Sequence, residues 1–326
     1  MKSKEKIIKN NTKKVVIGIL STAVSICLVY WLLSRLEWSK VRQILSGANF
    51  KWLVMSVTAT CCVPFFCVIR WLGVLKAKEI RLPFTVALRA VLMANVVNSF
   101  VPSKAGDVIK AAYLKSHGGI SLGVGTVVLE RMVDLAVLGS LSLGASILSS
   151  VTWGMAGGGI LLLTVCGFMI CAVKLPVSAL PLPDKAKRII TELTSVFGKW
   201  VHNSEAIAQT IAGSVIVWSM AGLTVYFLVR AFSVPVSWER AFSIFPLCIL
   251  AGLIPVTVSG IGTRDAAFVQ FLMMYGASVE GATLVGLGYT FCAYWILSLI
   301  SLPAVFWNLI VYFKRSSKNI QAESIA

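Results

Sequence analysis

The feature that most constrains this chain is a series of long apolar runs separated by clusters of lysine and arginine. A helix needs about 20 apolar residues to cross a bilayer, and several of the runs reach that length. The chain is 57% hydrophobic and 13% charged, whereas soluble domains carry about 25% charged residues. Its polar side chains are too few to cover a soluble surface. The sequence therefore predicts an all-α polytopic integral membrane protein.

Six of the runs are predicted to be full transmembrane helices, namely residues 15–33, 52–75, 120–151, 156–175, 207–229 and 282–313. The first run could be read as a signal peptide. It is longer than the apolar core of one, however, and no small-residue cleavage site follows it. Dense Lys/Arg clusters favour the cytoplasmic side of a membrane. We therefore expect a multi-pass protein of the cell membrane with both termini in the cytoplasm.

Two further regions do not fit a simple sequence of crossings. If all the basic clusters are cytoplasmic, residues 84–117 must begin and end on the cytoplasmic side, and residues 241–277 on the outer side. Each region then forms a re-entrant helical hairpin, and the two enter from opposite faces as in an inverted repeat. Such proteins bind their substrates near the midplane, where broken helices meet. The alternative is that some of these pieces cross fully.

The whole chain, residues 1–326, is predicted to be one membrane domain. A first half (1–183) and a second half (204–313) flank a polar interval at 184–203, and a short basic tail follows at 314–326. The interval alternates charged positions with apolar ones at helical spacing. This pattern predicts an amphipathic helix on the cytoplasmic surface.

Charge and cysteine usage exclude several classes of function. The net charge is +17, but the cations cluster between apolar runs, which indicates topology signals and contacts to anionic lipid headgroups rather than nucleic-acid binding. The eight cysteines lie within apolar runs and make no metal-ligand spacing with His117 or His202. We expect them to be small buried hydrophobic residues, and we expect neither a metal nor a cofactor.

The first polar motif interrupts the chain between two apolar runs. Its candidate binding residues are Asn98, Pro102, Lys104, Gly106, Asp107 and Lys110. Proline removes a helix donor, and glycine permits backbone conformations closed to other residues. Irregular backbone at membrane depth must line a wet cavity or be buried in protein. The lysines could attract an anion, while Asp107 could cap a helix or pair with Lys110. The alternative is an ordinary surface turn.

Three ionisable residues, Glu130, Arg131 and Asp134, lie inside one apolar run. Glu130 and Asp134 are four apart and share a helix face, and Arg131 can pair with Asp134. Ionisable residues within the membrane are costly, so a functional site is the default hypothesis. The alternative is a set of ion pairs that only holds helices together.

A second polar motif has the same character as the first. Its candidate binding residues are Ser259, Gly260, Gly262, Arg264 and Asp265. The glycines and the hydroxyl suit a backbone nest for phosphate oxygens, to which Arg264 could add a bidentate contact. Asp265 could hold the guanidinium or bind an amine. The motif is not a P-loop, and a loop with a capping Asp is the alternative.

Taken together, the three motifs resemble those of the lysylphosphatidylglycerol synthase transmembrane region family, also called the flippase-like domain family. The matching segments are 98–110, 129–134 and 254–265, and the resemblance covers nearly the whole chain. Asp107 and Asp265 stand where the family often has Glu, and Lys110 where it often has Arg. These departures bear on substrate specificity, because reach and bidentate geometry change.

The resemblance implies a protein that moves an anionic or aminoacylated phospholipid, such as lysyl-phosphatidylglycerol, between leaflets. Bifunctional members carry a soluble transferase domain after the membrane domain, whereas this chain stops soon after its last run. The membrane phospholipid itself is the expected partner, as substrate. A separate lipid-modifying enzyme could supply it, and the chain could also form a homo-oligomer.

Three alternatives remain from the sequence. The chain could be the membrane part of a phosphatidylglycerol lysyltransferase, or a transferase or flippase for polyprenyl-phosphate-linked sugars. A transferase would need a carboxylate base or metal ligands, for which Asp107 and Glu130 are the candidates. It could also be an accessory membrane protein without transport.

Overall fold

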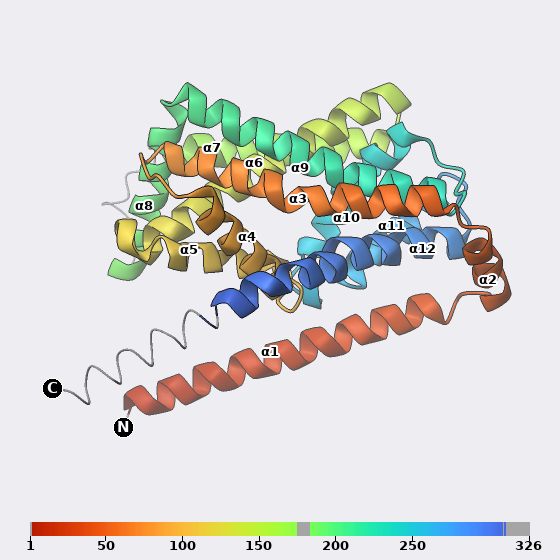
Figure 1. The fold of residues 1–326 in the computed structure, drawn as a ribbon, viewed down its shortest axis with the longest axis horizontal. Coiled ribbons are helices and arrows are strands. Elements are labelled where there is room, and N and C mark those ends of the chain that lie inside the picture. Colours follow the sequence, from red (N-terminus) through yellow and green to blue (C-terminus); the bar gives the residue numbers. More distant parts are fainter. Residues whose placement is uncertain (1, 175–182, 309, 311–326) are drawn as a thin grey trace.

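The structure, a computed structural model, describes residues 2–174, 183–308 and 310. Within these residues it is entirely helical, which confirms the predicted all-α class. The predicted basic tail at 314–326 lies outside the described residues. We name the two ends of the elongated bundle by helices that mark them, the α2 end (Trp38–Ser46) and the α8 end (Asp184–Val201) (Figure 1).

Five helices in the described part of the chain are long and apolar enough to cross a membrane. They are α3 (Phe50–Lys76), Gly119–Ser149 of α6 (Lys115–Ser149), Thr152–Ala172 of α7 (Thr152–Lys174), α9 (Ser204–Ala231) and Val279–Asn308. The last of these comprises α12 (Val279–Thr290), the π-helix η4 (Phe291–Ile296) and the helix that follows.

The first helix, α1 (Lys2–Leu33), could be the sixth crossing helix. Its segment Gly18–Leu33 meets the same test only together with α2, from which it bends by 85°. The prediction of about six crossing helices therefore agrees with the five or six found among the described residues. These helices make the chain a multi-pass membrane protein.

The first predicted hairpin is present. Helix α4 (Phe84–Asn98) starts at the α8 end and stops halfway along the bundle (Figure 1). A 3-10 turn, η1 (Pro102–Val108), reverses the chain, and the short helix α5 (Ile109–Tyr113) returns toward the α8 end. Proline at the start of η1 lacks the N–H that would continue the preceding helix.

The second hairpin has the same construction in the opposite direction. Helix α10 (Trp238–Leu253) enters from the α2 end, the turn η3 (Val258–Gly260) lies in the middle, and α11 (Thr263–Met273) returns (Figure 1). The turns η1 and η3 contact each other. Each half of the molecule thus places a half-length hairpin beside long helices, in opposite orientations, as an inverted repeat requires.

Small residues let the two halves pack closely. Helices α3 and α9 run antiparallel and share the most extensive interface in the described structure (Figure 1). A Cβ on Gly73 would lie 2.9 Å from the hydroxyl of Thr210, and one on Gly213 would lie 2.8 Å from the Cβ of Arg70. Close helix approach through glycine is the usual way in which membrane helices associate.

The interval at 184–203 forms helix α8, as predicted. Val196, Phe197 and Trp200 are buried where α8 packs on the bundle, mainly against α6, and the opposite face carries exposed residues such as Arg188. The amphipathic pattern therefore reflects packing against the protein on one face.

The prediction that the cysteines are buried was largely wrong. Only Cys248 and Cys292 are buried, whereas Cys27, Cys61, Cys62, Cys166 and Cys171 are exposed. Large apolar side chains such as Leu163 and Ile170 of α7 are exposed as well. In a membrane protein this outer apolar surface faces lipid tails, where cysteine is tolerated because it behaves as a small hydrophobic side chain.

Candidate functional site

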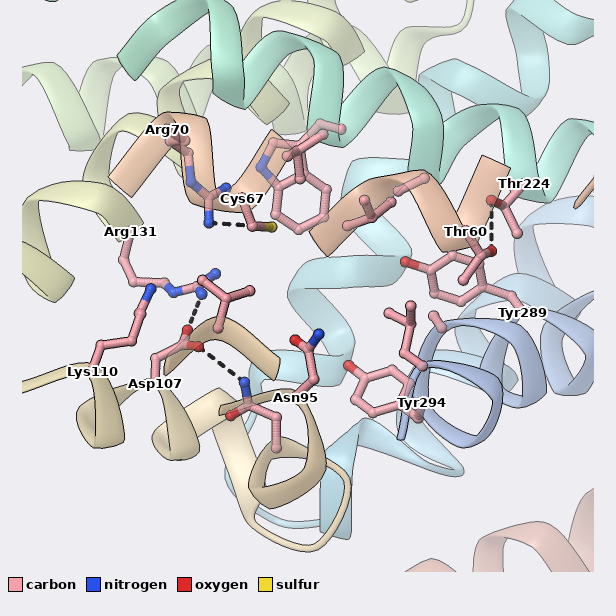
Figure 2. A pocket seen from close by; sticks show the side chains of 18 residues that line it. Thr60, Cys67, Arg70, Asn95, Asp107, Lys110, Arg131, Thr224, Tyr289 and Tyr294 are labelled. Carbon is pink, nitrogen blue, oxygen red and sulfur yellow. Dashed lines mark hydrogen bonds and ion pairs between the residues drawn. The ribbon is translucent and has the colours of Figure 1, made fainter. Parts of the chain in front are cut away.

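A polar cavity lies in the middle of the bundle, beside the point where the two hairpins meet. Its volume is about 90 Å³, and its walls come from α3, α4, η1, α5, α6, α9, α12 and the helix that continues α12. Of the predicted site residues, its walls bring together Asn98, Asp107, Lys110 and Arg131. Figure 2 shows Asn95 on the same side as Asp107. These residues come from four different elements, so the fold alone assembles them.

The charged side of the cavity is built on Arg70 of α3. Its guanidinium binds both carboxylates of α6, with Nε 2.7 Å from Glu130 Oε1 and Nη1 2.6 Å from Asp134 Oδ1. Arg70 is 2% exposed and Glu130 is fully buried. Although Arg70 lies close to the end of α3 at Lys76, its side chain points into the bundle and not toward the membrane surface.

The hairpin is tied to α6 by two further ion pairs. Arg131 pairs with Asp107 of η1, and its Nη1 lies 3.1 Å from Asp134 Oδ2. Lys110 of α5 pairs with Glu130. The expected partner of Asp107 was Lys110 or a helix terminus, but the cation that Asp107 contacts comes from α6. The predicted pair of Arg131 with Asp134 is confirmed.

Gly106 allows Asn98 to lie against Asp107. A Cβ on Gly106 would lie 2.8 Å from both the backbone nitrogen and Oδ1 of Asn98. In the absence of that atom, Asn98 Nδ2 donates to Asp107 Oδ1 over 3.0 Å. Asn98 Oδ1 is buried against Gly106 and has no hydrogen-bond partner among the described residues.

The six charges of this cluster cancel formally. Three cations face three carboxylates, namely Arg70, Lys110 and Arg131 against Asp107, Glu130 and Asp134. Removing one partner from a buried pair typically costs about 3–5 kcal/mol. The cluster is therefore held together by mutual neutralisation, and an added guest must be compatible with a site of zero net charge.

The second motif has a different geometry from the one expected. Asp265 Oδ2 accepts a hydrogen bond from the backbone N–H of Gly262 over 2.9 Å, and its Oδ1 accepts one from Thr290. The proposed backbone nest is thus engaged by the chain's own carboxylate, which caps α11. Gly260 packs on Gly252, since a Cβ there would lie 2.6 Å from the carbonyl oxygen of Gly252. These glycines serve close packing.

Arg264 lies next to the cavity rather than in its wall. Its guanidinium centre is 4.5 Å from the ring centroid of Tyr294 and 5.3 Å from that of Tyr289. It donates to Thr290 and to the carbonyl oxygen of Ser259, and Nε lies 3.8 Å from Asp265. With 1% exposure, Arg264 stabilises the second hairpin and positions the two tyrosines.

The far side of the cavity carries hydroxyl groups. Figure 2 shows Thr60, Thr224, Tyr289 and Tyr294 across from the charged cluster, with Asn95 between them. The hydroxyls of Thr60 and Thr224 lie 3.1 Å apart. Tyr294 belongs to the π-helix η4, a distortion that often occurs at functional sites. The cavity thus has an ionic side and a hydroxyl side.

Sequence reasoning missed Arg70, Trp218, Tyr289 and Tyr294 as wall residues. One feature of the sequence could have indicated Arg70. The three carboxylates at 107, 130 and 134 outnumber the cations Lys110 and Arg131, and a buried cluster needs equal numbers of positive and negative charges. The aromatic residues carry no comparable signal, since packing and cavity positions look alike in sequence. The side chains of Pro102 and Lys104, two predicted site residues, lie outside the described residues.

Comparison with known proteins agrees with this architecture. The family described as the lysylphosphatidylglycerol synthase TM region matches residues 18–301. Similar proteins include a UPF0104 membrane protein of Methanocaldococcus jannaschii, 30% identical over 62% of this chain and 90% of its own length.

Two other archaeal proteins extend the similarity. A UPF0104 membrane protein of Methanothermobacter thermautotrophicus is 23% identical over 72% of this chain and 79% of its own length. A UPF0104 membrane protein of Pyrococcus horikoshii is 20% identical over 88% of this chain and 95% of its own length. Since the family match includes both hairpins and the charged helix α6, this chain belongs to the lysylphosphatidylglycerol synthase transmembrane region family.

Proposed function

We propose that this protein moves a phospholipid with a polar, phosphate-bearing headgroup from one leaflet of the cell membrane to the other. The observation that carries the proposal is the polar cavity at the meeting point of two oppositely directed half-length hairpins. Intramembrane transporters bind substrate at such a point, because broken helices supply polar groups at depth. The family's lipid-related name supports the same substrate class.

The arrangement of the cavity suits the two parts of such a headgroup. Arg131 has a buried Nε without a hydrogen-bond partner among the described residues, and a guanidinium is well suited to a phosphate. The hydroxyl side opposite can bind an amine or a polyol. The predicted site residues Asn98, Asp107, Lys110, Glu130, Arg131 and Asp134 thus form the proposed binding site.

The zero net charge of the cluster narrows the class of headgroup that the site can bind. A single anion added to a buried neutral cluster would be uncompensated, which is costly. A headgroup that carries one phosphate and one amine brings its own compensation. A phospholipid such as phosphatidylethanolamine therefore fits this site better than phosphatidylglycerol, unless a proton enters with the anion, whereas the two amines of lysyl-phosphatidylglycerol leave one positive charge uncompensated.

The present conformation must open to admit a headgroup. A cavity of about 90 Å³ has room for several waters, each of which needs about 10–15 Å³, but not for a complete headgroup. The two hairpins meet where η1 contacts η3 and α10, so their separation there is the simplest way to enlarge the cavity toward one leaflet or the other.

We also propose an orientation. The α8 end carries Lys76, Lys78 and Arg81 together with α8 itself, and basic connections favour the cytoplasm. In this orientation the first hairpin enters from the cytoplasmic side and the second from the outer side.

The test is leaflet exchange in vesicles. The purified protein is reconstituted with fluorescent phosphatidylglycerol, phosphatidylethanolamine and lysyl-phosphatidylglycerol, and accessibility to an impermeant quencher or amine reagent is followed. We expect exchange well above that of empty vesicles, fastest for phosphatidylethanolamine, whose phosphate and single amine cancel. Arg131→Gln should slow it at least tenfold, while Arg42→Gln on the exposed side of α2 should leave it unchanged. Equal rates in protein-containing and empty vesicles for every headgroup would sink the proposal.

A further inference from the structure

A second, apolar cavity adjoins the polar one and shares Arg131 with it. Its volume is about 180 Å³, and it lies between α6, α9 and α10. Apart from Arg131 and Asp134, its walls are hydrophobic: Leu135 and Leu138 of α6, Trp218 of α9, and Ile249 and Leu253 of α10. Trp218 also borders the polar cavity. Arg131 therefore stands between a polar space and an apolar one.

From this juxtaposition we propose that the apolar cavity is a subsite for an acyl chain of the phospholipid whose phosphate binds Arg131. The inference rests on the proposed function and specifies where the hydrocarbon part of the substrate goes. Leu135 and Leu253 are half-buried, whereas Leu138 and Ile249 are buried, so the cavity reaches from the Arg131 side toward the outer surface of the bundle.

The volume of the apolar cavity is large enough for part of an acyl chain. Protein interiors are close-packed and contain few voids larger than a water molecule. An apolar cavity of about 150 Å³ in another protein stays dry and takes up benzene. By that comparison a cavity of about 180 Å³ holds roughly six carbons. The first part of an acyl chain would lie there, and the remainder would extend into the bilayer.

The reason for such a subsite is geometric. Lipid tails are as apolar as leucine, so a chain gains no hydrophobic energy by leaving the bilayer for the protein. The acyl chains are joined to the phosphate through a short glycerol linker, however, and the phosphate cannot reach Arg131 unless a chain has space beside it. The subsite therefore permits headgroup binding instead of driving it.

The test fills the cavity from its outer side. In Leu135→Trp and Leu253→Trp the larger side chain replaces a half-buried leucine, and Leu163→Trp is the matched control because Leu163 is 77% exposed on α7. Leaflet exchange of a dioleoyl phospholipid should fall at least about tenfold in both filled variants, since a chain forced into an overpacked site loses affinity steeply. The control should match the wild type.

A soluble probe separates the two parts of the site. Binding of sn-glycero-3-phosphoethanolamine to the detergent-solubilised protein, measured by calorimetry, needs no space for an acyl chain, because this probe carries the phosphate and the amine but no hydrocarbon. It should stay within about twofold of wild type in the filled variants. Wild-type exchange together with undiminished exchange in Leu253→Trp would overturn the subsite and leave the proposed function standing. A wild type that neither binds the probe nor exchanges lipid would overturn both.

A measurement on the wild type covers the case in which the filled variants misfold. A phospholipid with a diazirine near the glycerol end of its acyl chain is photolysed in vesicles, and the labelled peptides are identified by mass spectrometry. We expect labels on residues 135–138 or 249–253, displaced by excess unlabelled lipid. Labels confined to exposed positions such as Leu163 would overturn the subsite.

Discussion

The hydroxyl of Ser259 donates a hydrogen bond to the backbone carbonyl oxygen of Asn98 over 2.9 Å. This contact joins the turn of one hairpin directly to the end of α4 in the other, beside the polar cavity. Ser259 adopts a left-handed conformation, with φ +55°, which costs a non-glycine residue energy and is concentrated at functional positions. The contact is therefore a natural place for the hairpins to separate.

We predict that Ser259→Ala makes the cavity more accessible. Loss of one hydrogen bond of about 1 kcal/mol shifts an opening equilibrium about fivefold. In a background where Cys67 of the cavity wall is the single cysteine, an impermeant maleimide should react about five times faster. Ser301→Ala is the control, because that buried hydroxyl donates to the carbonyl oxygen of Leu297 in its own helix. Equal rates in the two variants would contradict a closing role for Ser259.

A second prediction concerns Arg70. Replacing it with leucine removes the cation shared by Glu130 and Asp134, so the free energy of unfolding should fall by about 3–5 kcal/mol. Arg42→Leu, at an exposed position of α2, should change it by no more than about 0.5 kcal/mol. Unfolding in mixed micelles, followed by circular dichroism, measures both. A small effect at Arg70 would mean that the cluster does not need its charge balance.

A third prediction separates backbone strain from close packing in the second hairpin. Gly260 and Gly276 both have positive φ, +73° and +90°, but only Gly260 has a close neighbour, Gly252. Gly276→Ala should lower the free energy of unfolding by about 1–2 kcal/mol, because alanine is strained at positive φ. Gly260→Ala should have the same strain and lose a further ~1–3 kcal/mol, because its Cβ would clash with Gly252. Equal losses would show that the contact with Gly252 can relax.

The crossing helices and the hairpins could be predicted from the sequence because both depend on quantities that a sequence carries. Span length and the positions of basic clusters determine which runs cross. A region such as 84–117 is polar in its middle, and both of its ends are assigned to the same side of the membrane. It must therefore enter the membrane and turn back. The pairing of Arg131 with Asp134 could also be predicted from the sequence, since it depends only on helical spacing.

The partners across the fold could not be predicted. Asp107 contacts Arg131, 24 residues away, and nothing local distinguishes that cation from Lys110. The glycines of the second motif illustrate the same limit. A phosphate nest and a close helix contact both require a residue without a side chain, so only the packed structure shows that Gly260 lies on Gly252 and Gly262 on Leu28 of α1.

The last prediction uses the zero net charge of the cavity cluster to test substrate selection. Asp107→Asn keeps the shape of the side chain and its position beside Asn98 but removes one negative charge, so the cluster becomes formally +1. An anionic headgroup then restores neutrality, and an amine-bearing one no longer does. Exchange of phosphatidylglycerol relative to phosphatidylethanolamine should therefore rise about tenfold, the effect of roughly 1.4 kcal/mol. Asp184→Asn, at the exposed start of α8, removes the same charge far from the cavity and should leave the ratio unchanged. If both variants kept the wild-type ratio, the charge of this cluster would have no part in choosing the lipid.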